Sequence, residues 1–271
     1  MNEPAIRVQD LGIRFLIRHQ RAPTVHSSMV RFLRRGGRPE EFWALRKINF
    51  EVGKGRVFGI IGPNGSGKST MLRVLSRILT PDEGEVELRG QVSSLLSLGA
   101  GFHAELTGLE NITYNGILLG LSRQEIERRK DKIIEFSGLG QRIDTPVRTY
   151  STGMRARLGF SVAVHVDPEI LVVDEVLVVG DARFRERCAN KMRELFSAGT
   201  TVVMVQHNLE AVLQMCHECL WLQDGAMRQL GDPLEVVNAY LNSQGIAPIG
   251  MPENATTGII SETMPTLGRK A

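Results

Sequence analysis

The sequence predicts an α/β fold in which helices cover both faces of a parallel sheet. The chain has 271 residues, of which 42% are hydrophobic, enough to bury a full core as one large domain or two closely packed lobes. Apolar runs typical of buried strands occupy residues 57–62, 170–175 and 201–207. Segments with helical spacing separate these runs, as expected where helices cross between parallel strands.

Strands and one helix are expected in order along the first ninety residues. Residues 6–15 and 48–52 have strand character, and the second of these segments leads into the buried strand at 57–62. A helix is predicted from residue 68 to about residue 79. The segment EGEVELRG, residues 83–90, alternates in polarity and ends on glycine, which indicates an exposed edge strand near a turn.

The middle of the chain is predicted to be mostly helical, with strands returning after it. Residues 122–139 open with Ser122 and place apolar residues at near-helical spacing. A helix is expected over 183–195, between the two later buried strands. Residues 244–271 contain no aromatic residue and several Pro, Gly and Thr, which indicates a flexible C-terminal tail.

The charge pattern argues against nucleic acid as a partner and marks one basic insertion. A formal net charge of +3 is small, whereas phosphate-backbone binders usually carry a dense basic face. No acidic residue lies between Asp10 and Glu40, and residues 24–38 would form a short amphipathic helix. The arginines between Asp10 and Glu40 are Arg14, Arg18, Arg21, Arg31, Arg34, Arg35 and Arg38. Contact with pyrophosphate or acidic lipid groups near a membrane partner is one interpretation, and a solvated surface hairpin is the other.

No segment of the sequence indicates membrane insertion, secretion or a metal centre. No apolar run reaches the roughly 18 residues of a spanning helix, and the first ten residues lack the basic then apolar order of a signal peptide. We therefore expect a chain kept in the cytosol. Cys216 and Cys219 form an isolated CxxC, which supplies only part of a four-ligand zinc site. With Cys188 they are expected to be small buried residues.

Residues 62–69 match the phosphate-binding pattern GxxxxGK[ST] between an apolar strand and a helix. The glycines let backbone N–H groups converge on phosphate oxygens at the helix N-terminus. Lys68 would reach the β and γ phosphates of ATP, and Ser69 would ligate Mg²⁺. A plain glycine turn is the alternative. The predicted nucleotide-binding residues of this loop are Asn64, Gly65, Ser66, Gly67, Lys68, Ser69 and Thr70.

Polar residues that suit hydrolysis follow the two later apolar strands. Asp174 would hold the metal through its water shell, and Glu175 would accept a proton from the attacking water. Two carboxylates at the end of an apolar strand are otherwise costly to bury. His207 ends the strand predicted at 201–207 and would touch the γ-phosphate, with a purely structural histidine as the alternative.

A second helix start able to hold an anion lies in YSTGMRARLGF, residues 150–160. Ser151 and Gly153 precede Arg155 and Arg157 there, about eighty residues after the phosphate-binding loop. The plain alternative is that Ser151 caps the helix and that both arginines lie on a solvated face.

These motifs resemble the ABC ATPases in order and spacing from about residue 6 to residue 240. The resemblance implies a P-loop NTPase (RecA-like) core with an antiparallel β subdomain and a helical signature subdomain. Residues 1–243 would form the ATP-binding domain, with the helical subdomain at about 97–160 and the basic insertion at about 16–42. In that family the signature residues, here Ser151, Thr152 and Gly153, bind ATP held by a second subunit. Phe15 would stack on adenine, and Asp181 would belong to the D-loop at the dimer interface.

Three longer segments resemble the ATP-binding subunits that export lipid-linked polysaccharides, such as O-antigen, capsule, teichoic acid and galactan exporters. They are EFWALRKINFEV at 41–52, LGAGFHAELTGLENI at 98–112 and DEVLVVGDARF at 174–184. The resemblance implies a head-to-tail homodimer bound to two integral membrane permease subunits at the cytoplasmic face of the inner membrane. The cofactors would be ATP and Mg²⁺, and contact with the polysaccharide would be indirect. The region after Ser243 is too short for an added β-sandwich that grips the glycan.

One departure and several alternatives accompany this resemblance. Around Ser97 to Gly99 the family carries a glutamine that senses magnesium and the membrane subunit, whereas Gln91 is the closest one here and lies too early. The alternatives are a motor for a different exported substrate, a soluble ABC ATPase of translation or DNA repair, and a regulatory module without turnover. Glu175 argues against the last, because a sensor has little need of a carboxylate that activates water.

Overall fold

The computed structural model describes residues 3–17, 40–96, 101–174 and 180–250. Several predictions fall outside these residues. Among them are Glu175, the missing-glutamine region at 97–99, the amphipathic helix at 24–38, and the tail beyond residue 250.

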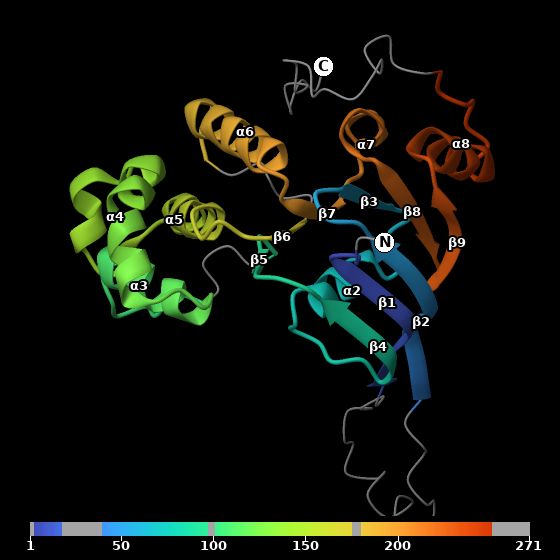
Figure 1. The fold of residues 1–271 in the computed structure, drawn as a ribbon, viewed down its shortest axis with the longest axis horizontal. Coiled ribbons are helices and arrows are strands. Elements are labelled where there is room, and N and C mark those ends of the chain that lie inside the picture. Colours follow the sequence, from blue (N-terminus) through green and yellow to red (C-terminus); the bar gives the residue numbers. More distant parts are fainter. Residues whose placement is uncertain (1–2, 18–39, 97–100, 175–179, 251–271) are drawn as a thin grey trace, which may run out of the picture.

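Two sheets and a lobe of helices form the fold (Figure 1). The strands are β1 (Ile6–Ile17), β2 (Glu40–Val52), β3 (Val57–Ile61), β4 (Glu83–Leu88), β5 (Val92–Ser94), β6 (Ile170–Val173), β7 (Thr201–Val205), β8 (Glu218–Gln223) and β9 (Ala226–Gly231). The helices are α2 (Lys68–Leu75), α3 (Gly108–Leu118), α4 (Arg123–Ser137), α5 (Thr152–Val164), α6 (Ala182–Ser197), α7 (Leu209–Met215) and α8 (Pro233–Ser243), with short 3-10 turns at Gly140–Asp144 and Val147–Thr149. In the described part of the chain, no helix has the length and apolar character needed to cross a bilayer.

The larger sheet has the order β5-β6-β7-β3-β8-β9, and all neighbours are parallel except β8 and β9. The predicted parallel sheet is therefore confirmed, with an antiparallel hairpin at one edge. Asp224 and Gly225 connect the hairpin with φ angles of 51° and 72°. Positive φ at both central residues is what a tight two-residue hairpin turn requires, and Asp-Gly satisfies it readily.

The smaller sheet is antiparallel, with the order β2-β1-β4. Ile6 lies opposite Val52 in β2 and opposite Leu88 in β4. The edge strand predicted over 83–90 is confirmed, because β4 forms one side of this sheet.

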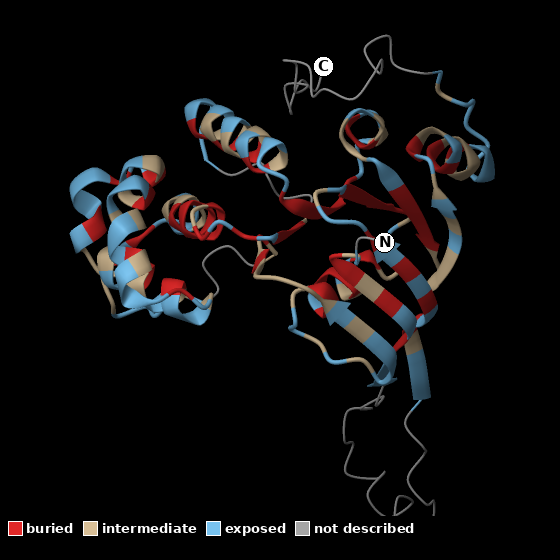
Figure 2. Cartoon of the chain, viewed as in Figure 1, coloured by how far each residue is buried: buried red, intermediate tan, exposed pale blue. Residues whose placement is uncertain are grey.

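Alternate residues of the parallel strands pack into two different cores, as the two-residue period of a strand requires. In β6, Ile170 and Val172 pack with the antiparallel sheet and α2, whereas Leu171 and Val173 pack with α5 and α6. The central strands are accordingly buried along their length (Figure 2). Burying each such side chain stabilises the fold by roughly 1.5–3 kcal/mol. The prediction that both faces of the parallel sheet are covered is confirmed.

The helical lobe contains α3, α4 and α5 around its own apolar core (Figure 1). The helix predicted over 122–139 is confirmed as α4. Ser122 caps it and forms a reciprocal capping box with Glu125, an arrangement worth about 1 kcal/mol per cap. Gly138, at φ 60°, ends the helix.

The predicted end of the helix after the glycine-rich loop is wrong. The helix α2 stops at Leu75 rather than near Leu79. Arg77 adopts a left-handed conformation with φ 58°, and the Ile78 N–H donates to the Arg73 carbonyl. This bond pattern closes a helix C-terminus even without glycine, which explains why composition alone did not indicate it.

Cys188 and Cys219 are small buried residues, as expected from the sequence. Cys216 is half-buried. Burial raises the pKa of Cys188 to about 12 and the pKa of Cys219 to about 12. Burial also raises the pKa of Cys216. All three thiols are therefore weak nucleophiles near neutral pH. Within the described ranges, no group of three or more His, Cys, Asp or Glu side chains is placed to hold a metal.

Candidate nucleotide-binding site

The carboxyl ends of β3, β6 and β7 lie at one edge of the parallel sheet. Val173 is opposite Met204, and Ile60 is opposite Val205. The glycine-rich loop follows β3, Asp174 follows β6, and His207 lies two residues beyond β7. The structure therefore brings the loop, Asp174 and His207 to the same edge, where open α/β sheets bind their ligands.

Two glycines let the loop pack tightly between neighbouring strands. A Cβ at Gly62 would lie 2.0 Å from the Leu222 carbonyl oxygen, and a Cβ at Gly67 would lie 2.6 Å from the Ala44 carbonyl oxygen. Gly65, by contrast, faces open space, with no heavy atom within 4 Å of a Cβ placed there. The loop is closed on its protein side and open at Gly65, as a cradle for an oxyanion must be.

The polar groups of the loop fit an anion. Gly67 caps α2 in a left-handed conformation without any side-chain bond, so the first N–H groups of the helix lack a side-chain acceptor. Lys68 is only 7% exposed, and its Nζ donates to the carbonyls of Gly62 (2.7 Å) and Pro63 (2.8 Å). The buried Ser66 Oγ has no hydrogen-bond partner among the described residues. A buried hydroxyl of this kind needs an acceptor or donor from a ligand or water.

Ser69 and Asp174 have the chemistry that Mg²⁺ prefers. Ser69 is exposed at the start of α2, and Asp174 is half-buried just beyond β6. Mg²⁺ binds through one or two protein oxygens and completes its shell with water and phosphate oxygens. A hydroxyl and a carboxylate at one sheet edge fit this requirement. The exposed Asn64 and half-buried Thr70 flank the same cradle.

The β8–β9 hairpin supports the loop, a contact that the sequence analysis missed. The Gly225 N–H donates to the Ser66 carbonyl at 3.2 Å, and the Gly225 carbonyl accepts from the Arg46 N–H at 2.8 Å. The sequence signal is the Asp-Gly pair at 224–225 between two strand-like runs. The hairpin therefore connects the phosphate-binding loop with β2.

Ala44 and Leu45 of β2 lie against Gly67 of the loop, whereas Phe15 is in β1. It is 39% exposed and pairs across the antiparallel sheet with Phe42. Trp43, beside Ala44, lies under two guanidinium groups, with Arg14 at 5.8 Å and Arg46 at 5.2 Å from its ring centroid. Trp43 is therefore an aromatic side chain next to a direct neighbour of the loop, and stacking of Phe15 on adenine stays a prediction.

The second predicted anion site begins α5. Ser151 caps this helix by accepting the Met154 N–H at 3.2 Å, and Ser151, Thr152 and Gly153 are all exposed. A Cβ at Gly153 would meet nothing closer than the Ser151 Oγ, at 3.8 Å. In Figure 1, α5 lies with the helical lobe, whereas α2 lies beneath the parallel sheet. The described chain thus holds the two helix starts predicted to bind anions in separate parts of the molecule.

Asp181 caps α6 and accepts the Phe184 N–H at 2.8 Å. This bond lowers the pKa of the Asp181 carboxyl. Burial opposes that shift, and the nearby positive charges of Arg157 and Arg187 lower the pKa further. The interpretation that Arg155 and Arg157 both lie on a solvated face is wrong for Arg157. Its side chain is 19% exposed and forms an ion pair with Asp181, while Arg155 is exposed.

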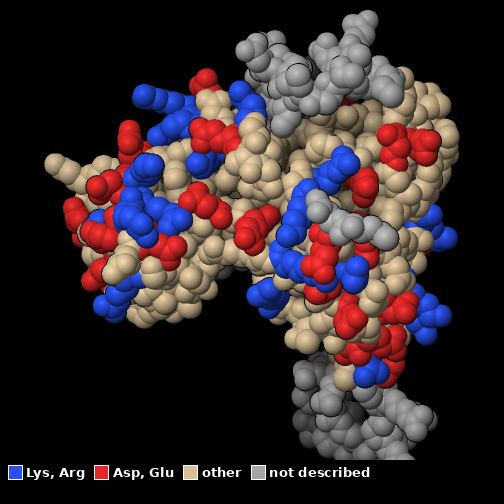
Figure 3. All heavy atoms as spheres, in the orientation of Figure 1, with Lys and Arg blue, Asp and Glu red and all other residues tan. Residues whose placement is uncertain are grey.

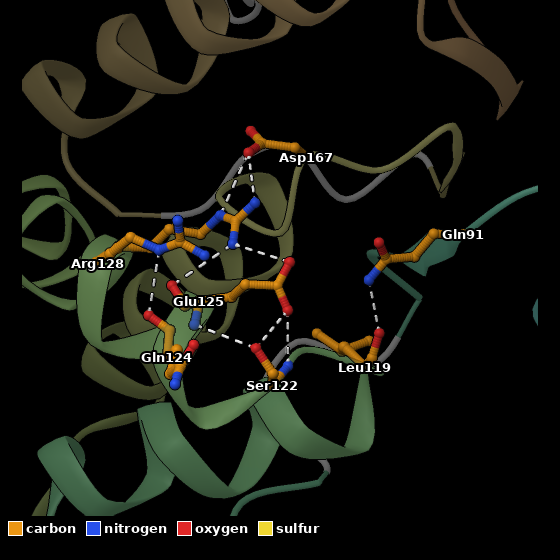
Figure 4. Close-up of polar contacts among 8 residues, drawn as sticks. Gln91, Leu119, Ser122, Gln124, Glu125, Arg128 and Asp167 are labelled. Atoms are coloured by element: carbon orange, nitrogen blue, oxygen red, sulfur yellow. Dashed lines mark hydrogen bonds and ion pairs between the residues drawn. The ribbon is translucent and has the colours of Figure 1, made fainter.

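Gln91 connects the sheet to the helical lobe (Figure 4). Its side-chain amide donates to the Leu119 carbonyl at the end of α3, at 2.7 Å. Arg129 in α4 makes a second connection, donating to Asp167 at 2.9 and 3.2 Å. Gln91 therefore links the two lobes from a position before the one expected for the family glutamine.

Comparisons with known proteins agree with this geometry. Residues 45–178 match the family described as ABC transporter. The chain is 46% identical over 227 residues to an O-antigen export system ATP-binding protein of Myxococcus xanthus, covering 83% of this chain and 52% of that protein. It is 44% identical over 200 residues to one of Klebsiella pneumoniae, covering 74% and 81%. A teichoic acids export ATP-binding protein of Listeria innocua is 40% identical over 209 residues, covering 77% and 62%.

Solved structures share the fold at low sequence identity. A structure of an ATP-binding subunit of an ABC transporter has a TM-score of 0.68 and 20% identity, covering 90% of this chain and 95% of that one. A dimeric ATP-binding cassette bound to ADP and phosphate has a TM-score of 0.65 and 21% identity, covering 84% and 98%. These likenesses confirm the predicted P-loop core with an antiparallel β subdomain and a helical lobe.

Proposed function

We propose, from the premise that this chain belongs to the ABC transporter family and is an ATPase of that family, that it drives the export of a lipid-linked polysaccharide. The observation that carries the cargo assignment is the 44% identity over most of the length of an O-antigen export ATP-binding protein. The chain spans only about half of the Myxococcus relative. The proposed ATP-binding domain comprises residues 1–243, followed by the tail at 244–271.

The proposed mechanism begins with ATP in the glycine-rich cradle. Backbone N–H groups at the start of α2 and the Lys68 ammonium bind its phosphates, and Phe15 stacks on the adenine. Ser69 and Asp174 would hold Mg²⁺, which would supply positive charge to the phosphates. Glu175 accepts a proton from the attacking water, and His207 contacts the γ-phosphate.

A second copy completes each site. Because Ser151, Thr152 and Gly153 are exposed and lie in a separate lobe from the loop of their own chain, we assign them to the γ-phosphate held by the partner. Asp181 lies at the same proposed interface. Two copies arranged head to tail would bury two ATP molecules between them, and hydrolysis would release the pair.

The proposed partners in the membrane are two integral permease subunits, which would place the ATPase at the cytoplasmic face of the inner membrane. The face shown in Figure 3 carries acidic and basic side chains interspersed. Oppositely charged side chains also pair on α4, as in Lys130–Glu127, and Arg129 of α4 pairs with Asp167. Such a mixed surface suits protein partners better than a nucleic-acid backbone. Contact with the polysaccharide would be made mainly by the permease.

Deleting the gene in its own organism tests the cargo. We expect the surface polysaccharide to disappear and its lipid-linked precursor to accumulate inside the cell, with rescue by the wild-type gene but not by Lys68→Ala. The control is Lys132→Ala, which removes a lysine on α4 away from the site. A surface polymer that persists unchanged while another exported molecule is retained would contradict the assignment and favour a motor for a different substrate.

A further inference from the structure

Arg157 joins three elements of the chain at a single guanidinium. Its Nε donates to the Ser137 carbonyl at 2.8 Å, and an Nη donates to the Gly138 carbonyl at 3.0 Å. These carbonyls end α4, where unpaired acceptors and the negative end of the helix dipole favour a cation. The same guanidinium lies 5.1 Å from the centroid of the buried Phe184 ring.

The third contact reaches Asp181 at the start of α6. Arg157 Nη1 lies 3.7 Å from one Asp181 carboxylate oxygen, while the other oxygen accepts the Phe184 N–H. Asp181 is therefore held from two directions, by the helix that it caps and by an arginine of α5. A guanidinium suits this position because its planar fork can serve several acceptors at once.

Arg157 and Asp181 belong to the two segments that the proposed function assigns to the dimer interface. Arg157 follows the exposed Gly153 by little more than one turn of α5, and Ser151 caps the same helix. A displacement of α5 that broke the contacts of Arg157 would remove one of the two contacts that hold Asp181. A displacement of Asp181 would likewise remove one contact of Arg157. The contacts thus link the position of the signature residues to the position of the D-loop in the same chain.

We propose that Arg157 is a positioning residue that fixes the signature helix α5 relative to Asp181, so that both meet the partner's ATP together. This inference rests on the proposed composite site. It predicts that loss of Arg157 weakens ATP-dependent dimerisation without weakening the binding of ATP to the chain's own glycine-rich loop.

The test uses the full chain carrying Glu175→Gln, so that turnover does not obscure dimerisation. Arg157→Met is added, and the monomer–dimer equilibrium is measured in MgATP by analytical ultracentrifugation. We expect the dimer to weaken about tenfold or more, with the affinity for a fluorescent ATP analogue unchanged. Arg157→Lys, which keeps the charge but not the fork, should fall between the two.

Arg129→Met is the matched control. Arg129 also connects a helix of the helical lobe to an aspartate of another segment, the exposed Asp167, and its side chain is 23% exposed against 19% for Arg157. It lies outside α5 and does not contact Asp181. We expect its loss to leave ATP-dependent dimerisation unchanged even if the melting temperature falls.

A double-mutant cycle identifies the partner of Arg157. Asp181→Asn preserves a cap for α6 and removes the charge, so Arg157→Met should add little further weakening in that background. Three results would each overturn the inference. The first is equal dimerisation of Arg157→Met and its parent, and the second is an equal loss of dimer affinity in Arg157→Met and Arg129→Met. The third is a fully additive loss of dimer affinity in the double-mutant cycle. If the Glu175→Gln parent itself fails to dimerise with ATP, the proposed function falls together with this inference. An unaffected Arg157→Met variant beside a dimerising parent overturns this inference alone.

Discussion

Replacing Gly153 with aspartate is expected to abolish steady-state ATP hydrolysis while leaving ATP binding to the isolated chain intact. Gly153 is exposed in the first turn of α5, and a side chain there meets no close neighbour within its own chain. A carboxylate at this position favours the helix itself, so the fold should persist. In the composite site, however, it would face the γ-phosphate of the partner's ATP. We expect kcat to fall at least about a hundredfold, the scale of losing one preorganised donor.

A mixture of two inactive variants, Gly153→Asp and Lys68→Ala, provides the control for this prediction. Lys68→Ala should also be inactive, because its own cradle no longer binds the phosphates. A heterodimer of Gly153→Asp and Lys68→Ala nevertheless contains one intact pair, the loop of the first chain and the signature of the second. Phosphate release from a single-turnover mixture should therefore exceed the sum of the separate variants. Activity of the Gly153→Asp chain alone at the wild-type rate would contradict the role given to α5.

Glu175→Gln is expected to lower kcat by about 10²–10⁴-fold, the usual contribution of a general base. The amide keeps the size of the side chain but does not accept the proton of the attacking water. With chemistry blocked, MgATP should hold the chain as a stable dimer, and EDTA should dissociate it. Size-exclusion chromatography with and without MgATP measures this difference.

Glu169→Gln is the matched control for the carboxylate. Glu169 lies just before β6, at the opposite end of the strand from Glu175, and its carboxylate accepts the Gln91 N–H. Glutamine can accept the same bond, so hydrolysis should persist. A Glu175→Gln chain that hydrolyses ATP normally, or stays monomeric in MgATP, would remove the proposed base from the mechanism.

Local sequence patterns predicted most of the fold because the relevant forces act over a few residues. Several features depend only on residues within one short segment. They are the apolar runs of β3, β6 and β7, the capping box of Ser122 and the glycine-rich loop. The end of α2 at Leu75 depended instead on a left-handed Arg77, which propensity does not favour. The β8–β9 hairpin had a usable Asp-Gly signal, and its contact with Ser66 depended on tertiary packing.

The residues of the candidate site were easier to predict than their contacts. The strand order explains why Asp174 and His207 lie at the same sheet edge as the glycine-rich loop, since parallel strands bring their carboxyl ends to one edge. The role of Arg157 was not predictable from helical spacing, because its partners lie at the end of α4 and the start of α6. Likewise, no pattern placed Trp43 between Arg14 and Arg46.

Cross-linking between two differently tagged chains tests the composite site most directly. One chain carries Asn64→Cys on the glycine-rich loop and the other carries Thr152→Cys on α5, both at exposed positions. The native thiols should react slowly, because burial raises the pKa of Cys188 and that of Cys219 to about 12 and also raises the pKa of Cys216. With MgATP and a short bismaleimide, the head-to-tail arrangement predicts covalent pairs of one large and one small chain, and few pairs of like chains. Equal cross-linking with and without ATP, or pairs formed only between like chains, would contradict it.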